Sequence, residues 1–288
     1  MRHPKPHPLF EIATERLPRR KAVTICGGVL CTDGIVLCAD TQETIGGYSK
    51  TDTSKIRSFH SNVFTLSMTG SCDDADYLEQ AFQEIVQACA DVCDPTKGRA
   101  PTWNEINGKL QTVCTDFFTT HLLPLAPTPQ DRPEISIILA IVVPPNVMCK
   151  VIRARGTTFL TSQAYHFTGI GSDVADQLYK KLFTSSLPMQ QTAGLAIHIL
   201  GHVKRTVAYC GGNSDIFLLR YSDGDYLHIP TAEARRLEEV YAAYDFEAHH
   251  NLANKIITSA PQDAQLVGFV RPQSTSPPLT SGTSVQEP

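Results

Sequence analysis

Residues 24–40 read TICGGVLCTDGIVLCAD and begin the predicted folded domain. Two apolar runs meet here, separated by the polar pair Thr32-Asp33 and closed by Gly34. The runs cover 22–31 and 34–39. Because two apolar runs joined by a short polar turn are typical of a β-hairpin, we expect two neighbouring antiparallel strands.

The chain then continues with one more strand and two helices. A strand is expected at 63–68, and apolar residues recur at helical spacing in the two patterns that follow it. Thr102 and Glu105 form a capping-box signature, so we expect the second helix to begin after Thr102. The two apolar stripes are Leu78, Phe82, Ile85, Cys89 and Val92, and Ile106, Leu110, Val113 and Phe117.

A second group of strands and helices follows a proline-rich break at 124–133. We expect strands at 135–143 and 147–154, extended segments near Phe159 and His166, helices at 173–183 and 189–208, a hairpin of 216–221 with 226–229, and a helix at 233–247. Each strand group is associated with a helix pair, and strands and helices do not alternate regularly. This order favours an α+β fold with stacked antiparallel sheets covered by helices over a doubly wound parallel sheet.

The composition is that of an ordinary globular protein. Hydrophobic residues make up 42% and charged residues 19% of the 288 residues, and the net charge is −4, so nothing favours a nucleic-acid or membrane partner. Nine cysteines are an odd number, and several lie in apolar runs, which favours a reducing compartment. The proline-broken start lacks the apolar centre of a secretory signal, and no apolar run approaches the roughly 20 residues of a membrane span. We therefore expect a cytoplasmic protein.

Both ends of the chain differ from its centre. Residues 1–23 are polar, contain prolines and are basic towards their end, which predicts an exposed N-terminal extension or propeptide. The segment after about 271 is rich in Pro, Ser and Thr and cannot bury enough apolar surface to become ordered. We expect one folded domain at 24–250, followed by a C-terminal extension at 251–288.

Several short motifs follow one another along the chain. The first motif is 24–40: a threonine, a strand, a turn ending in glycine, an apolar strand and an aspartate. The others are Thr44 with Gly46, Lys55-Ile56, Met68-Thr69-Gly70, Gly169-Ile170-Gly171-Ser172 and Ala208-Tyr209-Cys210-Gly211-Gly212. In this order the motifs resemble those of proteasome β-type subunits, which are N-terminal-nucleophile hydrolases. The resemblance covers about 22–230 and implies a four-layer α/β/β/α sandwich of two antiparallel sheets.

The resemblance also implies a chemistry. In this family self-cleavage makes a threonine the first residue, so that its hydroxyl is the nucleophile and its free α-amine the base. That residue would be Thr24, with Lys55 as the cation beside it and Asp40 orienting Lys55. Gly70 would supply the oxyanion amide, and Thr44 with Gly70 would bind the substrate backbone as an added strand. By analogy, the substrate pocket would be lined by Glu43, Thr53 and Met68. The implied partners are a polypeptide substrate and a ring of the same or related subunits, with no cofactor and no metal.

Three departures from the family pattern leave a second hypothesis open. Val207 stands where an aspartate is usual, Ile170 where a serine is usual, and Val23 where a glycine precedes the threonine. They favour a non-catalytic structural or gating subunit. A threonine-type endopeptidase of intracellular protein degradation is favoured by Thr24, Asp40, Lys55 and Gly70. A third hypothesis is an amidase acting on small amides, but no pocket residue supports it.

One other pair invites a functional reading. His198 and His202 lie four residues apart on an expected helix and so share one face. No third ligand is evident, and no glutamate follows His198 as in the zinc-protease motif. Packing or surface histidines are therefore favoured over a metal site.

Overall fold

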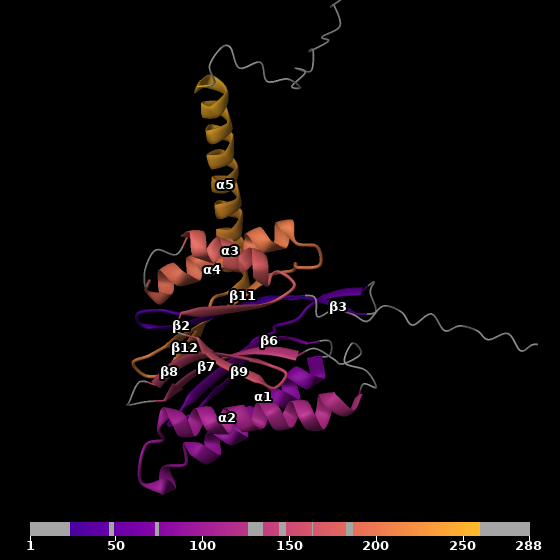
Figure 1. The fold of residues 1–288 in the computed structure, drawn as a ribbon. Coiled ribbons are helices and arrows are strands. Elements are labelled where there is room, and N and C mark those ends of the chain that lie inside the picture. Colours follow the sequence, from indigo (N-terminus) through magenta and orange to yellow (C-terminus); the bar gives the residue numbers. More distant parts are fainter. Residues whose placement is uncertain are drawn as a thin grey trace, which may run out of the picture. The chain divides into compact units, whose positions relative to one another are not determined.

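The computed structural model describes residues 24–45, 49–72, 75–125, 135–143, 148–162, 164–182 and 187–259. The expected extension at 1–23, Gly46, and the tail from 260 lie outside the described residues. The chain divides into two compact units, Met1–Tyr244 and Asp245–Pro288. The first unit contains all the strands and most of the helices (Figure 1).

Two five-stranded antiparallel sheets form the centre of the first unit. The order in the first sheet is β10 (Tyr165–Gly169), β1 (Ile25–Leu30), β2 (Gly34–Asp40), β11 (Ser214–Arg220) and β12 (Tyr226–His228). The order in the second is β5 (Arg57–His60), β6 (Thr65–Cys72), β7 (Ile135–Val143), β8 (Met148–Arg155) and β9 (Thr158–Ser162). A small hairpin, β3 (Gln42–Ile45) with β4 (Ser49–Asp52), lies between β2 and β5 in the chain.

The helices pack on the two sheets in pairs. α1 (Ala75–Val92) and α2 (Trp103–Phe117) share a buried apolar cluster with the second sheet, which includes Leu66, Ile85 and Leu110. α3 (Ser172–Leu182) and α4 (Met189–Thr206) share another with the first sheet, which includes Val29 and Ile197. Figure 1 shows the two pairs on opposite sides of the strands. The expectation of an α+β fold with antiparallel sheets and helix pairs is confirmed.

A third apolar cluster lies where side chains of the two sheets meet. Leu37 of β2 packs there with Ile138 of β7 and Val151 of β8, all fully buried. Because β2 and β7 have apolar neighbours on both faces, every residue of each strand is buried. This explains why their sequences are nearly continuous apolar runs and do not alternate.

Several elements differ from the sequence expectation in length or were not expected. α5 covers Thr231–Ser259, beyond the expected helix at 233–247. The β3–β4 hairpin was not expected, because its strands QETI and SKTD are polar. Three short helical segments were also missed: Pro95–Lys97, Phe118–Leu122, whose hydrogen bonding is of the π type, and Leu123–Leu125. No described helix is both long and apolar enough to span a bilayer.

The capping box at the start of α2 is confirmed, and it carries a stability prediction. The Thr102 hydroxyl accepts a bond from the Glu105 amide, and the Glu105 carboxylate accepts one from the Thr102 amide. Removing an N-cap hydroxyl typically costs about 1 kcal/mol. We therefore expect Thr102→Ala to lower the free energy of unfolding in urea by about that amount. Thr112→Ala, within the same helix, is the control and is expected to cause no loss, because alanine has the higher helix propensity.

Candidate active site

Thr24, Asp40 and Lys55 lie together at one end of the first sheet. The Lys55 ammonium nitrogen is 2.6 Å from the Thr24 hydroxyl oxygen and 2.8 Å from Asp40 Oδ1. The Thr24 hydroxyl donates a hydrogen bond to the same Asp40 oxygen. The structure therefore brings together the three residues that the sequence predicted as a catalytic set.

The β1–β2 hairpin positions two of the three residues. Thr24 directly precedes β1, and Asp40 is the last residue of β2. The strands pair with Cys26 opposite Ala39, so the start of one strand lies beside the end of the other. The amide of Ile25 completes the arrangement by donating to Asp40 Oδ1 at 3.2 Å.

Asp40 is fully buried, and four donors meet its carboxylate. Besides the Thr24 hydroxyl, the Ile25 amide and Lys55, the amide of Gly211 donates to Oδ2 at 3.0 Å. Removing a carboxylate from water is costly unless hydrogen bonds and an opposite charge replace the lost hydration. The Lys55 ammonium, whose side chain is 13% exposed, supplies that charge. Its third bond goes to the Gln42 carbonyl at 2.7 Å, so all three ammonium donors have acceptors.

The segment Ala208–Gly212 lies against these residues and depends on backbone geometry that few residues adopt. Tyr209 has φ +74°, a left-handed conformation that costs a non-glycine residue roughly 1–3 kcal/mol. The Gln42 side-chain amide donates to the Tyr209 carbonyl at 3.2 Å. A Cβ on Gly211 would lie 2.4 Å from Gln42 Oε1, so a larger residue there would displace the Gln42 side chain. No local signal in the sequence indicated a role for Gln42.

The Gly169–Ser172 motif packs against Thr24 from the other side. Gly169 has φ +95°, and a Cβ there would lie 2.1 Å from the Thr24 carbonyl oxygen. Ile170, where the resemblance places a serine, is 43% exposed. Val207 is partly buried against the apolar cluster of α3 and α4. Neither side chain offers the polar contact that the family pattern has at its position.

Two buried thiols lie near Thr24, and both are disfavoured as nucleophiles. Burial, with a smaller contribution from the Asp40 charge, raises the pKa of Cys210 to about 12. Burial also raises the pKa of Cys26, whose thiol donates to the Gly70 carbonyl at 3.1 Å. Because the thiolate is the reactive form of cysteine, neither competes with the Thr24 hydroxyl near neutral pH.

The predicted oxyanion and pocket residues are spread around this centre. Gly70 lies in β6, and its carbonyl accepts a hydrogen bond from the Cys26 thiol. Thr44 and the partly buried Glu43 lie on β3, and the Thr53 amide donates to the Thr41 carbonyl at 2.8 Å. Met68 is 1% exposed and belongs to the apolar cluster of α1 and α2. The substrate-binding roles of these residues remain predictions.

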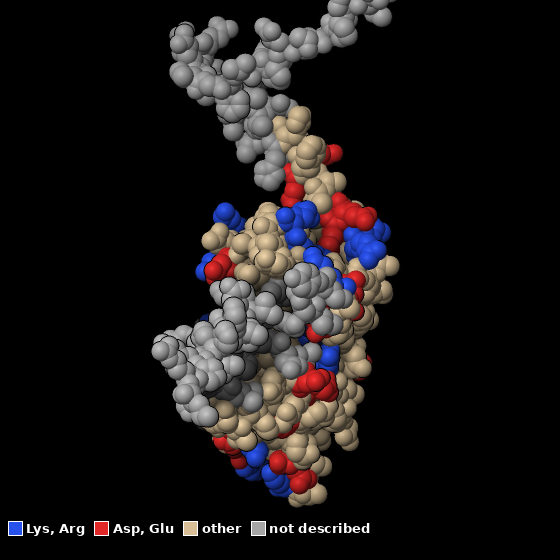
Figure 2. Space-filling view, turned by 90° about the vertical axis from the view of Figure 1, so that its right-hand side faces the viewer, with Lys and Arg blue, Asp and Glu red and all other residues tan. Residues whose placement is uncertain are grey.

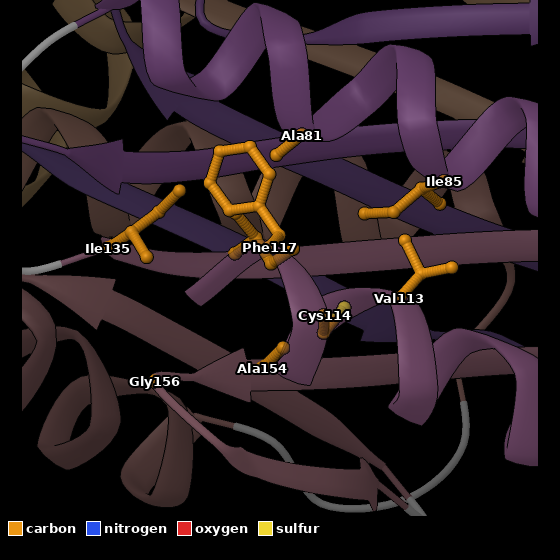
Figure 3. Close-up of a pocket in the computed structure, with 9 residues that line it drawn as sticks. Ala81, Ile85, Val113, Cys114, Phe117, Ile135, Ala154 and Gly156 are labelled. Atoms are coloured by element: carbon orange, nitrogen blue, oxygen red, sulfur yellow. The ribbon is translucent and has the colours of Figure 1, made fainter. Parts of the chain in front are cut away.

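A separate apolar hollow has no reactive groups. It lies between α1, α2 and the strands β7 and β8, with Ala81, Phe117 and Ile135 among its lining residues (Figure 3). Apart from the Cys114 thiol, its labelled residues carry apolar side chains, except Gly156, which has no side chain. Burial raises the pKa of that thiol to about 12, so the hollow is a packing feature.

The described residues include no metal-ligand cluster, and the face drawn in Figure 2 carries charges of both signs. Among the described residues, no three His, Cys, Asp or Glu side chains gather as a metal ion requires. His198 contacts the ring of Tyr241, with 5.4 Å between ring centroids. On the face drawn in Figure 2, Lys and Arg side chains are interspersed with Asp and Glu side chains.

Comparisons with known proteins place the fold. No family model matches the chain, and no curated protein matches it. Similar solved structures include Anbu, with its Gly-1 mutation, from Hyphomicrobium sp. strain MC1 (TM-score 0.63, 10% identity, 79% of this chain and 96% of that chain). Others are Anbu, described as an ancestral beta-subunit, from Yersinia bercovieri (0.60, 12%, 83% and 98%) and Anbu in a helical assembly from Pseudomonas aeruginosa (0.63, 12%, 80% and 96%).

These similarities correct the family expected from the sequence. The sequence motifs predicted a proteasome β-type subunit, whereas the similar solved structures are Anbu chains. At identities of 10–12% the likeness shows a shared fold and no more. The assignment to the proteasome β-type family is therefore wrong, and the Anbu fold replaces it.

Proposed function

We propose that this chain is a threonine-type peptidase of Anbu-like fold whose nucleophile is the Thr24 hydroxyl. The observation that carries the proposal is the 2.6 Å contact between the Lys55 ammonium and that hydroxyl. A cation at this distance stabilises the alkoxide that forms as the hydroxyl loses its proton. We also propose that the two helix pairs and the two sheets form the four-layer α/β/β/α sandwich of N-terminal-nucleophile hydrolases. The three apolar clusters would then lie between neighbouring layers.

The mechanism begins with cleavage of the bond between Val23 and Thr24. The released α-amine has a reference pKa of about 8, so it accepts the hydroxyl proton near neutral pH. The Thr24 oxygen then attacks the carbonyl carbon of a peptide substrate, with the Gly70 amide as the oxyanion donor. The amine product leaves with the proton, and water hydrolyses the ester that remains on Thr24. Thr44 would pair with the extended substrate, and Glu43, Thr53 and Met68 would shape its pocket.

A non-catalytic structural or gating subunit is the second candidate, and one observation favours it. Thr24 is only 3% exposed in the uncut chain, so a substrate cannot reach its hydroxyl in that form. Ile170 and Val207 also lack polar groups that would hold a free α-amine. If the bond before Thr24 stays intact, the Lys55–Asp40 pair is a structural ion pair only.

Assembly with copies of the same chain belongs to the proposal. The Pseudomonas aeruginosa Anbu structure is described as a helical assembly, and we propose a comparable self-association here. A polypeptide is the expected substrate, in a cytoplasmic protein without a nucleic-acid or membrane partner.

Intact mass spectrometry of the purified assembled protein tests the proposed function. We expect the mass of residues 24–288, because the mechanism needs the free amine of Thr24. Thr24→Ala is the control and should retain the full-length mass, since it lacks the hydroxyl that attacks the preceding carbonyl. A full-length mass in the unsubstituted protein would overturn the peptidase proposal and support the structural subunit.

A further inference from the structure

The backbone that carries Lys55 lies outside the strands. β4 ends at Asp52 and β5 begins at Arg57, so the four residues between them have no strand ladder to hold them. Yet the Lys55 ammonium reaches three acceptors at 2.6–2.8 Å. Other contacts must therefore fix this loop.

A buried carboxylate supplies one such contact. Asp215, on β11, is 3% exposed and accepts a hydrogen bond from the Ser54 hydroxyl. Its other oxygen is 2.6 Å from the Nε2 atom of His228 on the neighbouring strand β12. Asp215 pairs with Ala39 of β2 in the first sheet, and the residue before it, Ser214, pairs with Asp40. Ser54 is thus tied to the same rigid sheet that carries two of the proposed catalytic residues.

Other contacts hold the same loop beside the Ser54–Asp215 bond. The Ser54 carbonyl accepts a bond from Arg57 at 2.6 Å, and Ile56 is 4% exposed in the cluster between the sheets. The Thr53 amide also donates to the Thr41 carbonyl at 2.8 Å, and the Ser54 hydroxyl contacts the Ile56 backbone. The Ser54–Asp215 bond adds a side-chain tie to the first sheet at the residue directly before Lys55. Burying a carboxylate is costly, and the Ser54 hydroxyl and His228 are the donors that offset this cost.

We infer that Asp215 is a positioning residue for the proposed reaction, which anchors Ser54 and thereby holds the Lys55 ammonium against the Thr24 hydroxyl. The inference rests on the proposed function for its effect on rate. The contact itself is independent of that function. A displacement of about 1 Å in a catalytic group commonly costs on the order of a hundredfold in rate.

Chemical labelling of Lys55 tests the anchor without any need for activity. The full chain is acetylated with a limiting amount of acetic anhydride, and peptide mass spectrometry follows Lys55 against the exposed Lys50 as internal reference. We expect Ser54→Ala and Asp215→Ala to raise the Lys55 rate at least tenfold, while Ser54→Thr restores protection. Ser222→Ala is the matched control: its hydroxyl also binds a carboxylate, that of Asp223, but at the other end of β11. An unchanged Lys55 rate in Asp215→Ala overturns the inference, whatever Ser54→Ala shows, because Ser54→Ala also removes the contacts of the Ser54 hydroxyl with the Ile56 backbone.

Kinetics separate this inference from the proposed function. In an active enzyme we expect Ser54→Ala to lower kcat about a hundredfold with little change in KM, because Ser54 is not among the residues proposed to bind substrate. Faster labelling of Lys55 with an unchanged kcat overturns the positioning role. If the unsubstituted protein cleaves no peptide, the proposed function fails, and the labelling result alone decides whether Asp215 holds Lys55.

Discussion

Replacing Thr24 with alanine is expected to reduce kcat for peptide hydrolysis by about 10⁶-fold, the loss typical of removing a catalytic nucleophile. The Thr24 hydroxyl is bound by both Lys55 and Asp40, and alanine keeps the backbone but has no oxygen to attack the substrate. The variant should be produced with residue 24 as its first residue, so that a failure of self-cleavage is not mistaken for a failure of catalysis. Turnover of a fluorogenic peptide, with circular dichroism as a check on folding, measures the effect.

Two controls make this result specific. Thr24→Ser keeps a hydroxyl and should retain turnover. Thr65→Ala removes another buried threonine hydroxyl, one that bonds the Gly224 carbonyl, and should change stability without abolishing turnover. If Thr24→Ala hydrolyses peptide as fast as the unsubstituted enzyme, Thr24 is not the nucleophile.

Local pattern was sufficient to predict the elements that carry the site. The hairpin of β1 and β2 follows from two apolar runs and a polar turn, and it alone brings Thr24 to Asp40. The capping box at Thr102 was also readable, because both of its bonds lie within four residues. Lys55 was placed by the spacing of a known family and not by any local signal.

The contacts missed from the sequence are those that register and loop geometry create. Ser54 and Asp215 are 161 residues apart and meet only because β11 pairs with β2. Gln42 lies in a polar strand, and its contact with Tyr209 spans 167 residues. A buried Asp215 had one weak signal, an acidic residue at the start of an apolar strand, which a surface aspartate shares.

The wrong family assignment has a related cause. Strand lengths and glycine turns, such as Gly169 beside Thr24 and Gly211 beside Asp40, are required by the fold itself. Chains that share the fold therefore share these spacings, whichever branch they belong to. The motifs could indicate the architecture and the candidate site, but their spacing could not separate proteasome β-type subunits from other chains that share the fold.

The second large effect is expected for the Lys55–Asp40 pair, and it concerns stability as well as rate. Lys55→Met would leave the fully buried Asp40 carboxylate without its cation, which typically costs about 3–5 kcal/mol of unfolding free energy. Asp40→Asn should cost a comparable amount, because the ammonium loses its counter-charge. The double variant removes both charges. We therefore expect its loss of unfolding free energy to be smaller than the sum of the two single losses by about 1–3 kcal/mol. Urea unfolding of the four proteins measures this coupling.

The same cycle distinguishes a buried pair from an exposed one. Arg236 and Glu233 form an ion pair on α5 whose side chains are 61% and 45% exposed, and Arg236→Met is expected to leave the unfolding midpoint unchanged. A similarly small effect of Lys55→Met would mean that solvent screens Lys55 and that the ammonium does not hold the Thr24 hydroxyl. Lys55→Met should also abolish peptidase activity, because an alkoxide in a buried site without its cation is too costly to form. A large stability loss combined with full peptidase activity would therefore mean that Lys55 has a structural role only.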